Sequence, residues 1–196
     1  ALDFEDEFST AWHVVRNAET IIGQVGNILV IVVIFKEKRL HAPGNLILVS
    51  LAASDIVSNF HAPLMLILDQ LKLGGGKLDI WIKLCYFATY IHLFSGNANV
   101  FSVCLSAIDR YISIRYAIKY RIKMTMNRMK LIITVLWIIL MTKVTLEMKF
   151  GSTVRIENIC LLENVIDPMQ FKFGAIHTFV VPSIITTSLY AYVMSV

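Results

Sequence analysis

The chain has 196 residues, of which 57% are hydrophobic and only 16% are charged, and its formal net charge is +4. Soluble domains carry about 25% charged residues, so this chain has too few charges to cover a surface in water. Its mean hydropathy of +0.68 likewise excludes an ordinary soluble domain and favours a membrane protein. The basic residues lie between apolar runs and not on one patch, which argues against a nucleic-acid partner.

Five apolar runs follow one another along the chain, each near the length of about 20 residues that crosses a bilayer core. Lipid forces backbone polar groups to bond within a segment, so each run should be a helix. We therefore predict an all-α transmembrane helix bundle forming one domain over residues 1–196. Its helices should lie at about 12–37, 45–70, 82–115, 128–147 and 170–196.

The connections between the runs predict the orientation of the chain. The first connection carries Lys36, Lys38 and Arg39, whereas the N-terminal segment is acidic. The third connection holds six bases and no acid: Arg115, Lys119, Arg121, Lys123, Arg128 and Lys130. Because excess Lys and Arg marks the cytoplasmic side, the N-terminus should be extracellular and the C-terminus cytoplasmic, in a multi-pass protein of the plasma membrane.

A few polar residues interrupt the apolar runs, among them Asn27, Asp55, Asn97 and Asn99. An acid at the centre of a membrane helix costs about 2.5–3.5 kcal/mol on insertion scales, so these side chains should face the bundle interior. Hydrogen bonding between helices is the favoured role for Asn27 and Asn97. For Asp55 a functional role is favoured, because a buried carboxylate must take up a proton or bind a cation.

Lys143 and Glu147 stand four residues apart near the outer end of the fourth helix. Long charged side chains at that depth can reach the interface, in which case they carry little functional meaning. Cys85 and Cys160 both fall on the oxidising side, where we predict a disulfide that fastens the outer loop to the third helix. Cys104 lies deep in the membrane and should be a small buried apolar residue.

Several motifs occur in a fixed order along the chain. They are Gly26–Asn27, Asn45 to Asp55 (NLILVSLAASD), Trp81 with Cys85, Asp109–Arg110–Tyr111 (DRY), Trp137, Cys160, and Pro182 with Tyr190. Each is weak alone, but together, and on matching sides of the membrane, they cover nearly the whole chain. The chain resembles the rhodopsin-like (class A) G-protein-coupled receptors, of whose seven helices it holds the first five.

The resemblance implies roles for residues at the cytoplasmic end. In this family the DRY arginine is held by its neighbouring acid at rest and is freed on activation to receive the G protein. Here these residues are Arg110 and Asp109. Because arginine does not lose its proton, it needs a partner near lipid. The coupling and activation residues implied are Asp109, Arg110, Tyr111, Ile118 and Tyr190.

The resemblance also implies a sodium and water pocket and a ligand pocket. Asp55, Asn99, Ser95 and Asn27 match the former, although the family usually has serine where Asn99 stands. The ligand pocket would include His92, Gly96, Gly174 and Thr178. His92 stands where amine receptors have an aspartate, and Gly174 and Thr178 stand where catecholamine receptors have serines, which argues against a catechol ligand.

The implied function is to pass the signal of an extracellular small-molecule or peptide ligand to a heterotrimeric G protein, with receptor dimers as a further interaction. Beyond Na⁺ near Asp55, no cofactor or other metal is expected. No nucleophile elbow, HExxH or nucleotide motif is present, so an enzyme is not expected. Because the sequence stops in the fifth helix, one alternative remains. It is a truncated, non-signalling five-helix receptor that only associates with full-length receptors.

Overall fold

The computed structural model describes residues 2–61, 63–64, 67, 78–151 and 168–195. Across these residues the chain is helical and contains no strand, which confirms the predicted all-α class. The elements are α1 (Leu2–Lys36), the 3₁₀ turn η1 (Lys38–Leu40), α2 (Asn45–Asn59), α4 (Leu78–Arg115), α5 (Ala117–Lys123), α6 (Met126–Gly151), α8 (Pro168–Ala175), the π-helical segment η2 (Ile176–Val180) and α9 (Val181–Ser195).

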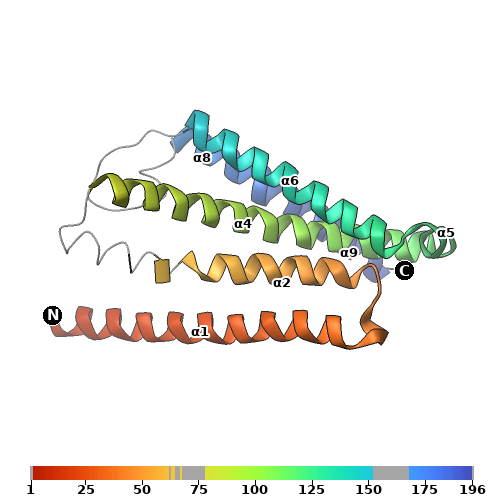
Figure 1. Ribbon diagram of the computed structural model, residues 1–196, viewed down its shortest axis with the longest axis horizontal. Helices are drawn as coiled ribbons and strands as arrows, with labels where there is room; N and C mark the ends of the chain where they lie inside the picture. Colours follow the sequence, from red (N-terminus) through yellow and green to blue (C-terminus); the bar gives the residue numbers. More distant parts are fainter. Residues whose placement is uncertain (1, 62, 65–66, 68–77, 152–167, 196) are drawn as a thin grey trace.

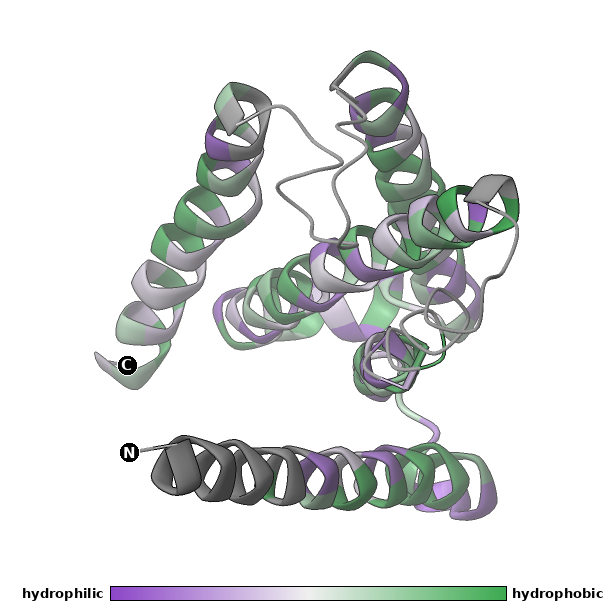
Figure 2. Cartoon of the chain, turned by 90° about the vertical axis from the view of Figure 1, so that its left-hand side faces the viewer, coloured by the Kyte–Doolittle hydropathy of each residue, from purple (hydrophilic) through white to green (hydrophobic). Residues whose placement is uncertain are grey.

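Four of these helical stretches are long and apolar enough to cross a membrane: Asn17–Lys36, Ile80–Arg115, Met126–Phe150 and Lys172–Ser195. The predicted span at 45–70 begins with α2 and continues into residues outside the described part. Exposed side chains on these helices include Ile22, Val25 and Leu29 of α1, as expected for surfaces that face lipid. Figure 2 shows hydrophobic residues along all of the long helices. The chain is a multi-pass membrane protein.

Helix α4 is the centre of the bundle and packs against α2, α6 and α9 (Figure 1). Helix α1 lies on the outside, against α2. The three small buried residues Ala88, Ala98 and Ala107 let neighbouring helices approach α4 closely. Because α4 is 38 residues long, it connects the two ends of the bundle through one rigid element. We call the end where α5 lies the α5 end.

The last helical stretch runs through α8, η2 and α9, and its π-helical turn at Ile176–Val180 lies just before the buried Pro182. Proline has no backbone N–H and its ring crowds the carbonyl four residues earlier, so a regular α-helix cannot pass through it. The wider π turn relieves this conflict. It also turns Thr178, which is 4% exposed, toward the bundle interior.

Hydrogen bonds join α2, α4 and α6 in the bundle centre. The indole nitrogen of Trp137 donates to Ser50 Oγ at 2.9 Å, and Ser50 Oγ lies 3.3 Å from Ser102 Oγ. Ser50 and Ser102 are almost fully buried. Buried polar groups of this kind must be paired. These hydrogen bonds therefore fix how α2, α4 and α6 are rotated about their own axes, which apolar contacts alone would not determine.

Candidate functional site: the polar interior from the Lys143 network to the α5 end

At the α5 end, Asp109 is buried near the end of the central helix and is 6% exposed. The connection from α4 to α6, residues 116–125, contains α5 and folds back over this carboxyl group. Tyr120 Oη donates a hydrogen bond to Asp109 Oδ1 at 2.7 Å. On the other side, a Cβ atom at Gly44 would lie 2.8 Å from Asp109 Oδ2, so only glycine fits there without displacement. Asp109 is thus enclosed by two connections.

The Tyr120 phenol remains a hydrogen-bond donor over the physiological pH range. Burial raises the pKa of Tyr120 above its ordinary value of 10.0, and the hydrogen bond with Asp109 and its negative charge raise the pKa further, against a smaller opposing effect of Arg110. A deprotonated phenolate beside a carboxylate would place two like charges together. The contact therefore persists as an O–H···O bond between the α5 connection and the DRY motif.

Arg110 is exposed, and within the described part of the chain its guanidinium forms no ion pair with Asp109. The resting-state pairing that the family resemblance implies is therefore not present in this structure. The reason is geometric: adjacent residues on a helix point about 100° apart. The Asp109 side chain turns inward to Tyr120, while Arg110 is left accessible at the helix end.

Of the other predicted coupling residues, Ile118 lies on α5 and is 79% exposed. Tyr111 packs edge-on against Tyr192 of α9, with ring centroids 5.2 Å apart. Tyr190 is also on α9 and is partly exposed. The structure thus brings Tyr111 into contact with α9, but through Tyr192, which the sequence analysis did not select.

In the middle of the bundle, Asp55 of α2 and Asn99 of α4 interact through their side chains. Asn99 Oδ1 also accepts a hydrogen bond from Ser54 Oγ. Ser95 is fully buried and donates to the backbone oxygen of His92 at 3.1 Å, which leaves its lone pairs available. Asn27 is half-buried on α1, and no hydrogen bond of its side chain is found among the described residues.

This arrangement allows a partial test of the sodium pocket. A carboxylate, a hydroxyl and an amide oxygen are ligands that hard cations prefer. Asp55, Ser95 and Asn99 carry oxygens of this kind, and the amide oxygen of Asn99 keeps a second lone pair beside the bond from Ser54. These three are therefore the residues that would hold the ion.

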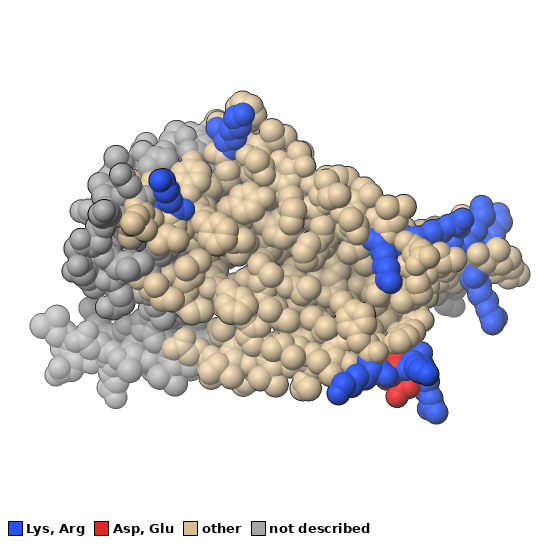
Figure 3. All heavy atoms as spheres, in the orientation of Figure 1, with Lys and Arg blue, Asp and Glu red and all other residues tan. Residues whose placement is uncertain are grey.

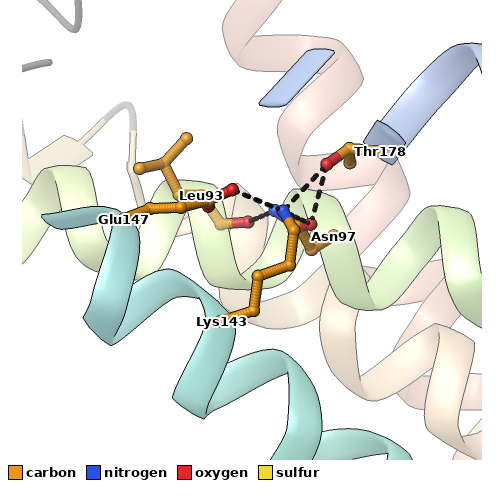
Figure 4. A network of polar contacts seen from close by, with 5 residues as sticks. All are labelled: Leu93, Asn97, Lys143, Glu147 and Thr178. Atoms are coloured by element: carbon orange, nitrogen blue, oxygen red, sulfur yellow. Dashed lines mark hydrogen bonds and ion pairs between the residues drawn. The ribbon is translucent and has the colours of Figure 1, made fainter. Parts of the chain in front are cut away.

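Toward the opposite end, Lys143 of α6 lies at the centre of a polar network that joins three helices (Figure 4). Its ammonium group forms an ion pair with Glu147 Oε1 at 2.8 Å. It also donates to Asn97 Oδ1 at 2.9 Å and to Thr178 Oγ1 at 3.1 Å. An ammonium has three N–H donors, so this set of three acceptors satisfies it completely.

The network is closed by a further bond, since Thr178 Oγ1 donates to Asn97 Oδ1 at 3.0 Å. Asn97 Nδ2 in turn donates to the backbone oxygen of Leu93 at 2.7 Å. The Lys143 ammonium thus points toward α4 and η2 and holds Glu147 beside the network, with the two side chains 27% and 31% exposed, which argues against the snorkelling interpretation. Asn97 has the interhelical role predicted for it.

The four predicted ligand-pocket residues do not share one set of neighbours. Thr178 and Gly174 lie at the network: Thr178 bonds to Lys143, and a Cβ at Gly174 would lie 3.5 Å from Glu147 Oε1. His92 instead packs on His61, with ring centroids 4.2 Å apart. Gly96 has open space where a Cβ would stand. Neither His61 nor the Lys143–Glu147 pair was predicted as part of this region.

The predicted disulfide has one partner in the described part: Cys85 is buried near the start of α4, whereas Cys160 lies outside the described residues. We expect Cys85→Ser to lower the stability of the protein by about 2–5 kcal/mol, because a native cross-link restricts the unfolded chain. Cys104→Ser is the matched control, since Cys104 is a buried free thiol. Mass mapping of thiols in the wild type checks the pairing, and a free Cys85 thiol would contradict it.

These features define a helical membrane protein whose polar interior runs from the Lys143 network to a buried carboxyl group and an exposed arginine at the α5 end. The description "7 transmembrane receptor (rhodopsin family)" belongs to the family model that matches residues 26–196. The chain belongs to this family, the rhodopsin-like (class A) G-protein-coupled receptors.

Individual relatives agree with this membership. The chain is 34% identical over 118 residues to an alpha-2Db adrenergic receptor of Danio rerio, covering 59% of this chain and 27% of that receptor. It is 39% identical over 119 residues to an alpha-2A adrenergic receptor of Danio rerio, covering 58% and 29%. A tyramine receptor of Caenorhabditis elegans is 36% identical over 118 residues, covering 60% and 25%. The matched part is about a quarter of each relative's length.

Proposed function

We propose that the complete receptor passes an extracellular ligand signal to a heterotrimeric G protein through the α5 end. The observation that supports this most is the enclosure of Asp109 by Tyr120, which leaves Arg110 exposed beside it. A carboxyl group held by a loop and an arginine free to bind are the two parts of a switch that a partner can bias. The exposed Ile118 offers an apolar contact beside Arg110.

The orientation that this function requires follows from charge. The first connection carries Lys36, Lys38 and Arg39, and the α5 connection carries Lys119, Arg121 and Lys123. Figure 3 shows Lys and Arg gathered at this end of the molecule. The α5 end is therefore cytoplasmic, and the N-terminus is extracellular, in the plasma membrane.

The chain is similar to adrenergic and tyramine receptors, and this similarity favours a small-molecule ligand. Two residues argue against a protonated amine. His92 takes the place of the aspartate that amine receptors use, and Glu147 is already paired with Lys143. A neutral ligand that offers a hydrogen-bond acceptor to His92 fits these side chains better than a cation does.

A nucleotide-exchange assay tests the coupling. The protein, extended by the sixth and seventh helices of its family and placed in phospholipid nanodiscs, should accelerate nucleotide exchange on a heterotrimeric G protein above the receptor-free rate. The 196-residue chain should not, if it only associates with full-length receptors. Exchange that stays at the receptor-free rate for the extended protein and its Asp109→Asn variant would contradict the proposal.

A sodium ion at Asp55 is the second element of the proposed function. We expect Na⁺ to raise the melting temperature of the wild type relative to equal concentrations of choline, because the ion binds only the folded state. Asp55→Asn removes the charge that holds the ion, so this Na⁺-dependent shift should vanish. Glu37→Gln is the control, since it also removes one negative charge, but from an exposed side chain in the connection between α1 and α2. An unchanged shift in Asp55→Asn would exclude the site.

A further inference from the structure

Two histidines from different parts of the fold stack on one another. His92 lies on α4, and His61 follows the last residue of α2, Asn59. Their ring centroids are 4.2 Å apart, and the ring planes are tilted by 31°. Both side chains are half-buried. The two imidazoles together can therefore bind a group that neither ring would hold alone, and this group would join α2 to α4.

The pair has bonding capacity that the described part of the chain does not use. Nδ1 of His92 is closed to solvent and has no hydrogen-bond partner there. No hydrogen bond to the His61 ring is found among the described residues either. About 90% or more of buried polar groups in proteins are paired, so such a nitrogen is exceptional. Its desolvation is already paid for on folding, so a ligand that reaches its lone pair gains a bond at little further cost.

The separation of the two rings suits shared coordination of one metal ion. Imidazoles bind Zn²⁺ through a nitrogen at about 2.0–2.1 Å, so two rings in neighbouring coordination positions have centroids about 4.5–5 Å apart. The observed 4.2 Å is slightly shorter, so small rotations of the two side chains admit the ion. Gly96 lies one turn along α4 from His92 and has open space where a Cβ would stand. This space leaves room for water molecules on the ion.

The donor atoms decide which ion fits. Imidazole nitrogens favour transition ions such as Zn²⁺ and Cu²⁺, whereas Mg²⁺ and Ca²⁺ prefer oxygen ligands. Asp55 precedes His61 by six residues, about 9 Å at a rise of 1.5 Å per residue, and its carboxyl interacts with Asn99. No group of three His, Cys, Asp or Glu side chains that could hold a metal occurs in the described part of the chain. Water would therefore complete the coordination.

We infer that His61 and His92 together bind one Zn²⁺ ion, or another transition ion with the same preference for imidazole, between the end of α2 and the half of α4 opposite the α5 end. A neutral imidazole gives the lone pair of one nitrogen to the ion and keeps an N–H on the other. His92 can therefore still donate to the ligand acceptor proposed above. The site is distinct from the sodium site at Asp55, and the inference requires neither that sodium ion nor G-protein coupling.

Calorimetric titration of Zn²⁺ into the purified chain in phosphatidylcholine nanodiscs tests this inference. The affinity should fall at least about tenfold in His61→Gln and in His92→Gln, because loss of even an outer partner of a metal ligand costs about 10–100-fold. The double variant should bind no more weakly than either single variant, since one remaining imidazole cannot chelate. His177→Gln is the matched control, because it removes an exposed imidazole from η2 and should leave the affinity unchanged. Additive losses, or an equal loss in the control, would overturn the inference.

Two further measurements separate loss of the site from loss of the fold. Electron spin-echo spectra of the Cu²⁺-loaded wild type should show two bound imidazoles, and a single one would contradict the pair. Zn²⁺ should raise the melting temperature of the wild type and of Asp55→Asn but not that of either histidine variant, because the ion binds only the folded protein with an intact site. Mg²⁺ at equal concentration should give no shift. A Zn²⁺ shift that persists in both histidine variants, or that Mg²⁺ reproduces, would refute the site.

Discussion

Replacing Glu147 with glutamine should lower the stability of the protein by about 2 kcal/mol, and replacing Lys143 with methionine in the same chain should restore most of that loss. The single change keeps the shape of the side chain but leaves the Lys143 ammonium without its 2.8 Å carboxylate partner. Because the two side chains are 27% and 31% exposed, the cost lies between that of breaking an exposed pair, about 0–1 kcal/mol, and that of breaking a buried pair, about 3–5 kcal/mol. The double change removes both charges together, so no unpaired charge remains.

The network itself predicts that the double variant folds well. Because Thr178 Oγ1 donates to Asn97 Oδ1 at 3.0 Å without help from Lys143, the loss of Lys143 leaves neither group unpaired. Thermal unfolding in nanodiscs measures all three variants, and Lys149→Met is the control for a cation nearby on the same helix. Lys149 is exposed and near the Phe150 ring. If Glu147→Gln alone is as stable as the wild type, the pair is not desolvated and the network does not join the helices.

The membrane spans could be predicted from the sequence because lipid demands long apolar runs and permits few backbone arrangements. The helix ends beside the basic connections also agree, since α2 begins at Asn45 and α4 ends at Arg115. Other ends differ, because hydropathy locates the membrane core and not the hydrogen bonds that end a helix. Helix α1 begins at Leu2, not near residue 12, because the acidic segment continues the helix beyond the apolar run. Likewise α4 begins at Leu78, ahead of the predicted residue 82.

The residues that line the interior were harder to predict than the spans. In water, one apolar stripe reveals which face of a helix is buried. In lipid both faces of a helix are apolar, so only its polar residues indicate which face is turned to the bundle interior. The sequence does not show which residues of other helices these polar residues contact. Asp55 and Asn97 were found in this way, but the contact of Asn97 with Lys143 depends on how α4 and α6 rotate.

Tyr120 is the clearest case of a functional contact that the sequence does not show. It follows Asp109 by 11 residues, and the chain must leave the helix at Tyr116 and turn back for the two side chains to meet. No periodic pattern encodes this turn. The sequence shows only a tyrosine among basic residues in a short connection. This pattern does not single out Tyr120, because Tyr116 has the same kind of neighbours and does not bond to Asp109.

In a receptor that includes the sixth and seventh helices of the family, Asp109→Asn should raise basal nucleotide exchange about fivefold, and Arg110→Ala in the same chain should abolish the increase. The charged acceptor of the Tyr120 hydrogen bond is worth about 1 kcal/mol or more, and 1 kcal/mol shifts a two-state equilibrium about fivefold. Basal exchange is a suitable measurement because it needs no ligand. Tyr120→Phe removes the donor instead of the charge and should raise basal exchange in the same direction.

The effect of Arg110 should be confined to coupling. Arg110 follows His92 by 18 residues on the continuous helix α4, about 27 Å at a rise of 1.5 Å per residue, so it cannot contact a ligand at His92. Arg115→Ala is the matched control: it removes another arginine from the same helix end, one that lies over the Tyr116 ring at 5.7 Å. It should leave the raised exchange of Asp109→Asn intact. If Arg115→Ala and Arg110→Ala suppress exchange equally, general positive charge at the α5 end, and not the DRY arginine, carries the coupling.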